Sequence, residues 1–130
     1  ITEQVNEMTN GKVDFKYYDE IKACAKEAKD AVMCSDINKL GNILHKTWIK
    51  KQKLSPKISN NRINEIYSDL RALGIYGGKI SGAGGGGFFL SIMDPLLQPK
   101  IVRYLNERND KNGFVFLPKL SDSGCQIWKK

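Results

Sequence analysis

The sequence predicts an α+β sandwich in which helices pack on one side of a mostly antiparallel, four-stranded sheet. Two observations lead to this class. Over the first half of the 130-residue chain, apolar residues recur every three or four positions, which is the period of a helix. Over the second half, short apolar runs bounded by Gly, Asp and Pro replace that period, with one helix among them. Helices collected on one side of such a sheet make a two-layer sandwich.

The first two helices are predicted from their apolar stripes and from the residues at their ends. The first covers about residues 18–34, and its alanine-rich stripe allows close packing. The second follows a cap at Ser35 or Asp36, since either side chain can accept a hydrogen bond from a backbone N–H group of the first turn. It ends before Pro56, because a proline ring does not fit into a helix interior.

A third helix and two strands follow. The helix runs from a cap at Asn60 or Asn61 to Gly74, which suits the left-handed position that commonly follows a helix. After Gly74 the apolar residues no longer recur at the helical period. Residues 76–81 and 88–93 are short runs bounded by glycines or by an Asp-Pro pair, and such runs are typical of strands.

The last part of the chain predicts one more helix and two more strands. The helix passes through residues 101–105. Asp94-Pro95 is a good cap and first turn for it, yet Pro99 would interrupt a helix begun there, so its start stays open. Residues 114–117 and 125–128 are the third and fourth predicted strands.

The chain is expected to be one domain, residues 1–130, and a fragment of a larger protein. Its length suits a single core, and 41% hydrophobic with 27% charged residues is ordinary for a soluble protein. No apolar run approaches the ~18 residues of a membrane span, and no secretory signal is present. Ile1, Val5 and Met8 repeat at helical spacing without a starting Met, which indicates that the chain begins inside a helix.

The cysteines indicate a cytoplasmic protein. Cys24, Cys34 and Cys125 cannot all pair. Within one helix the first two would lie ~15 Å apart, beyond the ~7 Å Cα limit for a disulfide, so we expect reduced thiols. With one histidine and no Cys-x-x-Cys pair, the sequence does not predict a zinc site.

The net charge of +7 has two interpretations. Lys50, Lys51 and Lys53 gather at the end of the second predicted helix, where cations suit the negative end of the helix dipole. Alternatively, this cluster attracts an anionic partner, either a phosphorylated small molecule or a nucleic acid.

The glycine run at residues 82–87, Gly-Ala-Gly-Gly-Gly-Gly, predicts more than a turn. Its Gly-x-Gly-x-x-Gly spacing fits a dinucleotide-binding loop. That motif requires a helix directly after the loop, and residues 88–92 do not have the sequence of a helix start. No Gly-Lys-Ser or Gly-Lys-Thr closes a Walker loop. A two-residue turn would suffice for a hairpin, and each glycine costs ~0.5–1 kcal/mol of extra backbone entropy relative to alanine. We therefore expect the backbone to approach another group closely here.

Residues 77–88, Gly-Gly-Lys-Ile-Ser-Gly-Ala-Gly-Gly-Gly-Gly-Phe, resemble the third conserved motif of the GHMP kinases, named for galactokinase, homoserine kinase, mevalonate kinase and phosphomevalonate kinase. Within this superfamily, the resemblance is greatest to sugar kinases that act on a heptose 7-phosphate, and it covers roughly residues 36–128. Its further matches are Leu44-His45-x-x-Trp48, Lys53-Leu54-Ser55, Ile58-Ser59-Asn60, Ile66-Tyr67 and Ser123-Gly124.

The resemblance implies the C-terminal domain of an ATP-dependent sugar kinase with a ferredoxin-like core. The family's Pro-x-x-x-Gly-Leu-Gly-Ser-Ser phosphate loop has no counterpart here. The catalytic base and most contacts to ATP and Mg²⁺ are then expected on an N-terminal domain that partners this one. We place no catalytic residue and no metal ligand on the chain, and we expect the chain alone to be inactive.

The binding residues expected on this chain fall into two groups. The loop would line the nucleotide phosphates and the substrate pocket, with backbone N–H groups that small residues leave uncovered. Its residues are Ser81, Gly82, Ala83, Gly84, Gly85, Gly86 and Gly87. The phosphorylated sugar would contact His45, Lys53, Lys79 and Ala83.

Two of these residues carry alternatives. His45 lies next to an apolar stripe, so it is either a packed helix residue or a contact to the sugar or its phosphate. Lys79 alternates with Ile80 and faces the opposite side of its strand, toward solvent or a cleft.

Two rival functions from other classes are a nucleic-acid-binding module and a noncatalytic kinase-like domain used for dimerisation. The first draws on the basic charge and on Gly74-Ile75-Tyr76-Gly77, which looks like the Gly-x-x-Gly loop of KH domains. However, that loop joins two helices and usually carries basic residues at its centre. Nucleic acid is therefore not expected as a partner. Without a long apolar run a membrane is not expected either, whereas a homodimer is compatible with the sequence.

Overall fold

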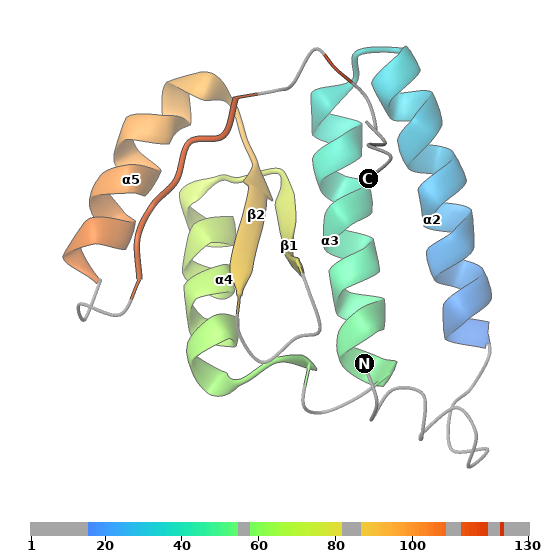
Figure 1. The fold of residues 1–130 in the computed structure, drawn as a ribbon, viewed down its shortest axis with the longest axis horizontal. Helices are drawn as coiled ribbons and strands as arrows, with labels where there is room; N and C mark the ends of the chain where they lie inside the picture. Colours follow the sequence, from blue (N-terminus) through green and yellow to red (C-terminus); the bar gives the residue numbers. More distant parts are fainter. Residues whose placement is uncertain (1–15, 55–57, 82–86, 109–112, 120–122, 124–130) are drawn as a thin grey trace, which may run out of the picture.

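The computed structural model describes residues 16–54, 58–81, 87–108, 113–119 and 123. Three helices precede a β-hairpin, and a short 3₁₀ helix and a further α-helix follow it (Figure 1). In chain order the elements are α2 (Lys16–Met33), α3 (Ile37–Leu54), α4 (Asn61–Leu73), β1 (Gly77–Ser81), β2 (Phe88–Ile92), η2 (Pro95–Leu97) and α5 (Gln98–Glu107).

The turn between α2 and α3 decides which of the two predicted caps is used. Ser35 takes a left-handed conformation, with φ 54°, and so ends α2. Asp36 then caps α3, because its Oδ1 accepts the Lys39 N–H at 2.9 Å. The prediction of a cap at this point is confirmed: Asp36 is the cap of α3, and Ser35 ends α2.

The ends of α4 confirm their predicted signals. Asn60 is extended and its side chain accepts the Ile63 N–H at 2.9 Å, so Asn60 is the cap. Gly74 has φ 110° and donates its N–H to the carbonyls of Leu70 and Arg71. A side chain at this φ would be strained, and the glycine turns the chain from α4 into β1.

The start of the last helix, which the sequence leaves open, is divided between a 3₁₀ turn and an α-helix. Asp94 accepts the Leu96 N–H at 2.8 Å and caps the 3₁₀ turn η2, with Pro95 as its first residue. Helix α5 begins at Gln98, so Pro99 lies in the first turn, where its missing N–H costs nothing.

The described sheet has two antiparallel strands, paired from Gly77↔Ile92 to Ser81↔Phe88. This confirms the α+β class and the first two predicted strands. The predicted strand at 114–117 is wrong, since residues 113–119 are described without strand structure. This segment runs beside β2 (Figure 1), and the Phe114 ring meets Phe88 edge-on at 5.8 Å. Residues 113–119 thus contact β2 through aromatic rings but form no backbone ladder with it. The predicted strand 125–128 lies outside the described residues.

The main core lies between α3, α4, α5 and the hairpin. Trp48, Ile58 and Leu70 are its largest fully buried side chains. Residues packed against them come from every one of these elements, among them Ile80, Phe89 and Ile101. A smaller cluster of Cys24, Ala31 and Ile43 joins α2 to α3.

Two of the three cysteines are described, and both are free thiols, Cys24 buried and Cys34 exposed. This agrees with the expectation that helix geometry keeps them apart. Within the described ranges, no helix has the length and apolar character needed to cross a membrane.

Candidate functional site

The glycine loop connects the paired ends of β1 and β2. Ser81 pairs with Phe88, so the loop is a hairpin connection, as one half of the prediction states. Gly87 has φ 103°, and a Cβ there would lie 3.0 Å from the Ser81 carbonyl oxygen. The two ends of the loop are therefore close together, and Gly87 is needed for the turn. Residues 82–86, which include predicted site residues Gly82 to Gly86, lie outside the described residues.

Strand β1 lies directly on α3. A Cβ on Gly77 would overlap the Gly41 carbonyl, and a Cβ on Gly41 would overlap the Cβ atom of Tyr76. Neither glycine can carry a side chain without separating the strand from the helix. The sequence offered a signal for this contact, because Gly41 interrupts an otherwise good helix at a cost of about 1 kcal/mol relative to alanine.

His45 lies beneath β1, one helical turn after Gly41. Its Nδ1 and the Tyr67 hydroxyl are 2.6 Å apart, and the two rings meet with centroids 5.7 Å apart. Burial lowers the pKa of His45, and the positive charge of Arg71 lowers it further. His45 is therefore a half-buried residue with an ordered polar partner, which is closer to the packed alternative than to a free ligand contact.

The three clustered lysines point in different directions. Lys50 forms an ion pair of 2.8 Å with Glu20 of α2. Lys53 places its ammonium 5.9 Å from the centre of the Tyr17 ring, also on α2. Lys51 differs from both, because burial lowers its pKa and the charge of Lys79 on β1 lowers it further.

Lys79 and Ile80 belong to opposite faces of β1, as their alternation along the strand predicts. Lys79 lies on the same face of β1 as Gly77, which contacts α3, whereas Ile80 enters the core toward α4. The charge of Lys79 thus acts on Lys51, whereas the ammonium of predicted site residue Lys53 lies over the Tyr17 ring of α2. Sequence reasoning grouped Lys51 with its neighbours but did not select it, since helical direction decides which lysine meets the strand.

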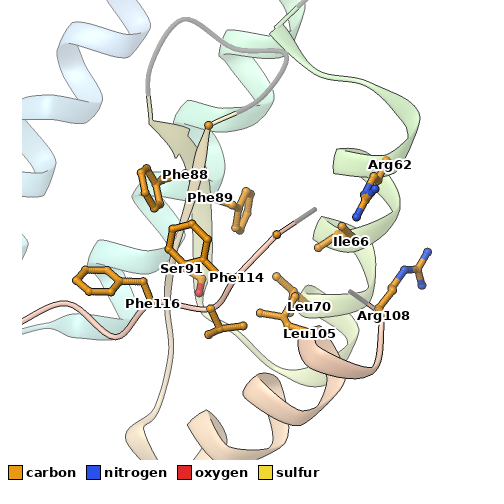
Figure 2. Close-up of a pocket in the computed structure, with 13 residues that line it drawn as sticks. Arg62, Ile66, Leu70, Phe88, Phe89, Ser91, Leu105, Arg108, Phe114 and Phe116 are labelled. Carbon is orange, nitrogen blue, oxygen red and sulfur yellow. The ribbon is translucent and has the colours of Figure 1, made fainter. Parts of the chain in front are cut away.

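A pocket of about 470 Å³ opens on the other face of the hairpin, between β2, α4, α5 and residues 113–116 (Figure 2). Phe88, Phe89, Phe114 and Phe116 line one side of it, and Arg62 and Arg108 stand at the opposite side. Arg108 is already paired with Asp69 at 2.6 Å and Glu65 at 3.0 Å. The pocket is thus chiefly apolar, and it reaches the glycine loop at Gly87.

The described part of the chain offers neither a metal cluster nor a loop of the KH type. In the described part of the chain, no three His, Cys, Asp or Glu side chains gather as a metal site. The Gly74–Gly77 segment leads from α4 into β1, so it does not join two helices as the Gly-x-x-Gly loop of KH domains does.

Comparisons with known proteins identify a family for most of the chain. Residues 21–111 match the family model described as GHMP kinases C terminal. The chain is 32% identical over 109 residues to D-glycero-alpha-D-manno-heptose 7-phosphate kinase of Campylobacter jejuni, a match that covers 84% of this chain and 31% of that protein.

Two fucose enzymes are also similar. The bifunctional fucokinase/GDP-fucose pyrophosphorylase of Arabidopsis thaliana is 30% identical over 79 residues, which are 61% of this chain and 7% of that protein. The L-fucokinase/L-fucose-1-P guanylyltransferase of Bacteroides fragilis is 27% identical over 121 residues, which are 91% of this chain and 12% of that protein. The chain thus spans less than a third of each of these three relatives.

Proposed function

The chain belongs to the GHMP kinases, and from this premise we propose that it is the C-terminal domain of an ATP-dependent sugar kinase. The proposed reaction transfers the γ-phosphoryl group of ATP to the anomeric hydroxyl of a heptose 7-phosphate. The similarity to the heptose kinase of C. jejuni supports this acceptor, and the two fucose enzymes support a sugar as the wider class.

The observation that carries the proposal is the glycine hairpin with two lysines at its base. Ser81 and Gly87 hold the two ends of the loop close together. Burial lowers the pKa of Lys51 and the positive charge of Lys79 lowers it further, so an anion near the two lysines would offset part of this repulsion. Phosphoryl transfer depends mainly on positioning and on neutralising charge, and a loop of backbone N–H groups beside two cations suits both needs.

Each binding residue has a proposed role. Loop residues 81–87 line the phosphates of the nucleotide and the substrate pocket, and Ala83 is small enough to let a ligand approach. Lys79 binds the phosphate of the sugar, with Lys51 as its neighbour in place of Lys53, whose ammonium lies over Tyr17. When bound, ATP supplies the transferred group and Mg²⁺ neutralises its charge. We assign the metal no ligand among the described residues, which hold no cluster of three suitable side chains.

The direct test is a coupled assay of ADP release by the full-length protein that contains this chain. We expect release with ATP, Mg²⁺ and heptose 7-phosphate, less with fucose, and none above background without a sugar or with EDTA. The 130-residue chain alone should give none, because the catalytic base is proposed to lie on another domain. Turnover by the isolated chain, or no sugar-dependent turnover by the full-length protein, would contradict the proposal.

A substitution in the loop tests whether the loop belongs to the site. Ala83→Leu should raise the KM for ATP or for the sugar at least about tenfold, the equivalent of ~1.4 kcal/mol of binding, while the melting temperature stays unchanged. Ala72→Leu, at an exposed position of α4, is the matched control and should leave both constants unchanged. Equal kinetics for the two variants would remove the loop from the site.

A further inference from the structure

We propose that His45 is a positioning residue for the glycine loop: its Nδ1 orients the Tyr67 hydroxyl, and that hydroxyl holds the backbone of β1 at Gly78. The sequence suggested a contact from His45 to the substrate, and this inference assigns it a different task. It deepens the proposed function, on which its kinetic test rests, but its structural test is independent of activity.

The first support is the way that Tyr67 is held. Its side chain is 6% exposed, and its ring packs against Phe89 at 5.3 Å and edge-on against Trp48 at 6.5 Å. The surrounding rings leave the hydroxyl little freedom of direction. The hydroxyl oxygen lies 2.6 Å from His45 Nδ1, and the backbone N–H of Gly78 acts to lower the pKa of Tyr67, as a donor directed at the same oxygen would.

The second support is that these contacts join three elements at the strand that enters the loop. His45 comes from α3, Tyr67 from α4 and Gly78 from β1. A Cβ on Gly77 would lie 3.1 Å from the His45 Cβ, so the histidine lies immediately beneath the strand. Arg71 of α4 donates to the carbonyls of Ile75 at 2.8 Å and Tyr76 at 2.5 Å, which holds the chain just before β1. Strand β1 is thereby fixed four residues before the loop begins.

The proton count identifies the form of His45 that can do this. In the proposed arrangement, the Tyr67 oxygen accepts the Gly78 N–H and the single proton of the hydroxyl is donated to His45 Nδ1. Neutral His45 must therefore carry its own proton on Nε2. A protonated imidazole has N–H groups at both positions and cannot accept this bond.

The charges around the pair favour the neutral form. Arg71 is the charged group whose field reaches both residues: it lowers the pKa of His45 and opposes the rise that burial causes in the pKa of Tyr67. Burial of His45 acts in the same direction as Arg71. Both effects keep Nδ1 available as an acceptor at neutral pH.

Two substitutions separate positioning from substrate contact. Asparagine places its amide where Nδ1 lies in histidine, whereas glutamine places its amide nearer to Nε2. We expect His45→Asn in the full-length enzyme to keep kcat/KM within about threefold. His45→Gln should lose about five- to tenfold, the size of one lost hydrogen bond. The reverse order, with glutamine active and asparagine impaired, would overturn the inference and restore a substrate contact through Nε2.

An NMR measurement on the 130-residue chain decides the same question without turnover. The chain has one histidine, so its two ring ¹⁵N signals need no further assignment. We expect the Nε2–H tautomer, and we expect Tyr67→Phe to mix the tautomers and to shift the Gly78 amide signal. Tyr104→Phe removes a hydroxyl that bonds Asp69 instead, and it is the matched control that should change neither. An Nδ1–H tautomer would contradict the inference even if the enzyme is active. Histidine ring and Gly78 amide signals that are unchanged in Tyr67→Phe would contradict it as well.

Discussion

The two strands of the hairpin differ in how they are held. Gly77, Gly78 and Ile80 of β1 are buried, whereas Phe88 and Leu90 of β2 are 61% and 43% exposed. Strand β1 has α3 on one face and the core side chains of α4 on the other. Strand β2 gains its backbone bonds from β1, and its outer neighbour, residues 113–119, contacts it through side chains. One end of the glycine loop is therefore anchored in the core, and the other depends on its partner strand.

The difference teaches that glycine and aromatic residues serve opposite purposes in this hairpin. Gly41 and Gly77 let a helix and a strand meet backbone to backbone. The exposed aromatic and aliphatic groups around β2 lie instead where an apolar surface is open in the described part of the chain. They are Phe88, Leu90, Phe114, Phe116 and Leu117. An exposed apolar strand face of this kind is a typical place for further protein to pack.

The largest effect is expected where the two backbones meet. Gly77→Ala places a methyl group on the Gly41 carbonyl, and because a backbone cannot rotate away as a side chain does, the strand must leave the helix. We expect a loss of about 3 kcal/mol or more in the free energy of unfolding, measured by urea denaturation. Ser81→Ala, at the exposed end of the same strand, should change it by less than about 0.5 kcal/mol. Similar losses for both variants would contradict the close packing of β1 on α3.

A pair of leucines compares the two sides directly. Leu70 of α4 is 1% exposed and Leu90 of β2 is 43% exposed. Leu70→Ala should cost about 2–5 kcal/mol, since it leaves a cavity in the core. Leu90→Ala removes a side chain that is already half in water and should cost less than about 1 kcal/mol. An equal cost at both sites in thermal or urea unfolding would mean that β2 is as well packed as β1.

The smallest effect is expected from pH. Burial and Arg71 lower the pKa of folded His45 below the ~6.5 of an unfolded histidine, so the folded state binds this proton less readily. Stability from this group is fully present above pH ~6.5 and is lost as pH falls toward the lowered pKa. Urea unfolding between pH 7.5 and 5.5 should show this slope in the wild type and a weaker one in His45→Asn. Equal slopes would show that His45 titrates alike in both states.

Local chemistry predicted the elements well because each end carries its own signal. Asn60 and Gly74 bound α4 as expected, and Asp94 and Pro99 both proved to be start signals, one for η2 and one for α5. The strand at 114–117 failed, because a strand exists only where a neighbouring backbone completes its hydrogen bonds. Composition indicates that a segment suits a strand, but it does not indicate whether another strand lies beside it to form the hydrogen bonds.

The candidate site was predicted in part for the same reason. The glycine hairpin and the family were readable from residues 77–88, since contiguous residues define both. The choice between Lys51 and Lys53 was not, because two residues along a helix turn a side chain by about 200° and only the packing of α3 on β1 decides which lysine meets Lys79. The sequence also showed that Gly41 is unusual inside a helix, but it did not show that the reason is the close contact with β1.

By itself, the sequence determined the order of the helices, their caps, the hairpin and membership of the GHMP kinases. These rest on neighbours in the chain, whose geometry is set by local dihedral and hydrogen-bond preferences. The tertiary structure decided that Gly41 and Gly77 bring α3 against β1, that the charge of Lys79 acts on Lys51, and that His45 meets Tyr67. Such contacts join residues far apart in the chain, and they exist only once burial of the shared core has brought the elements together.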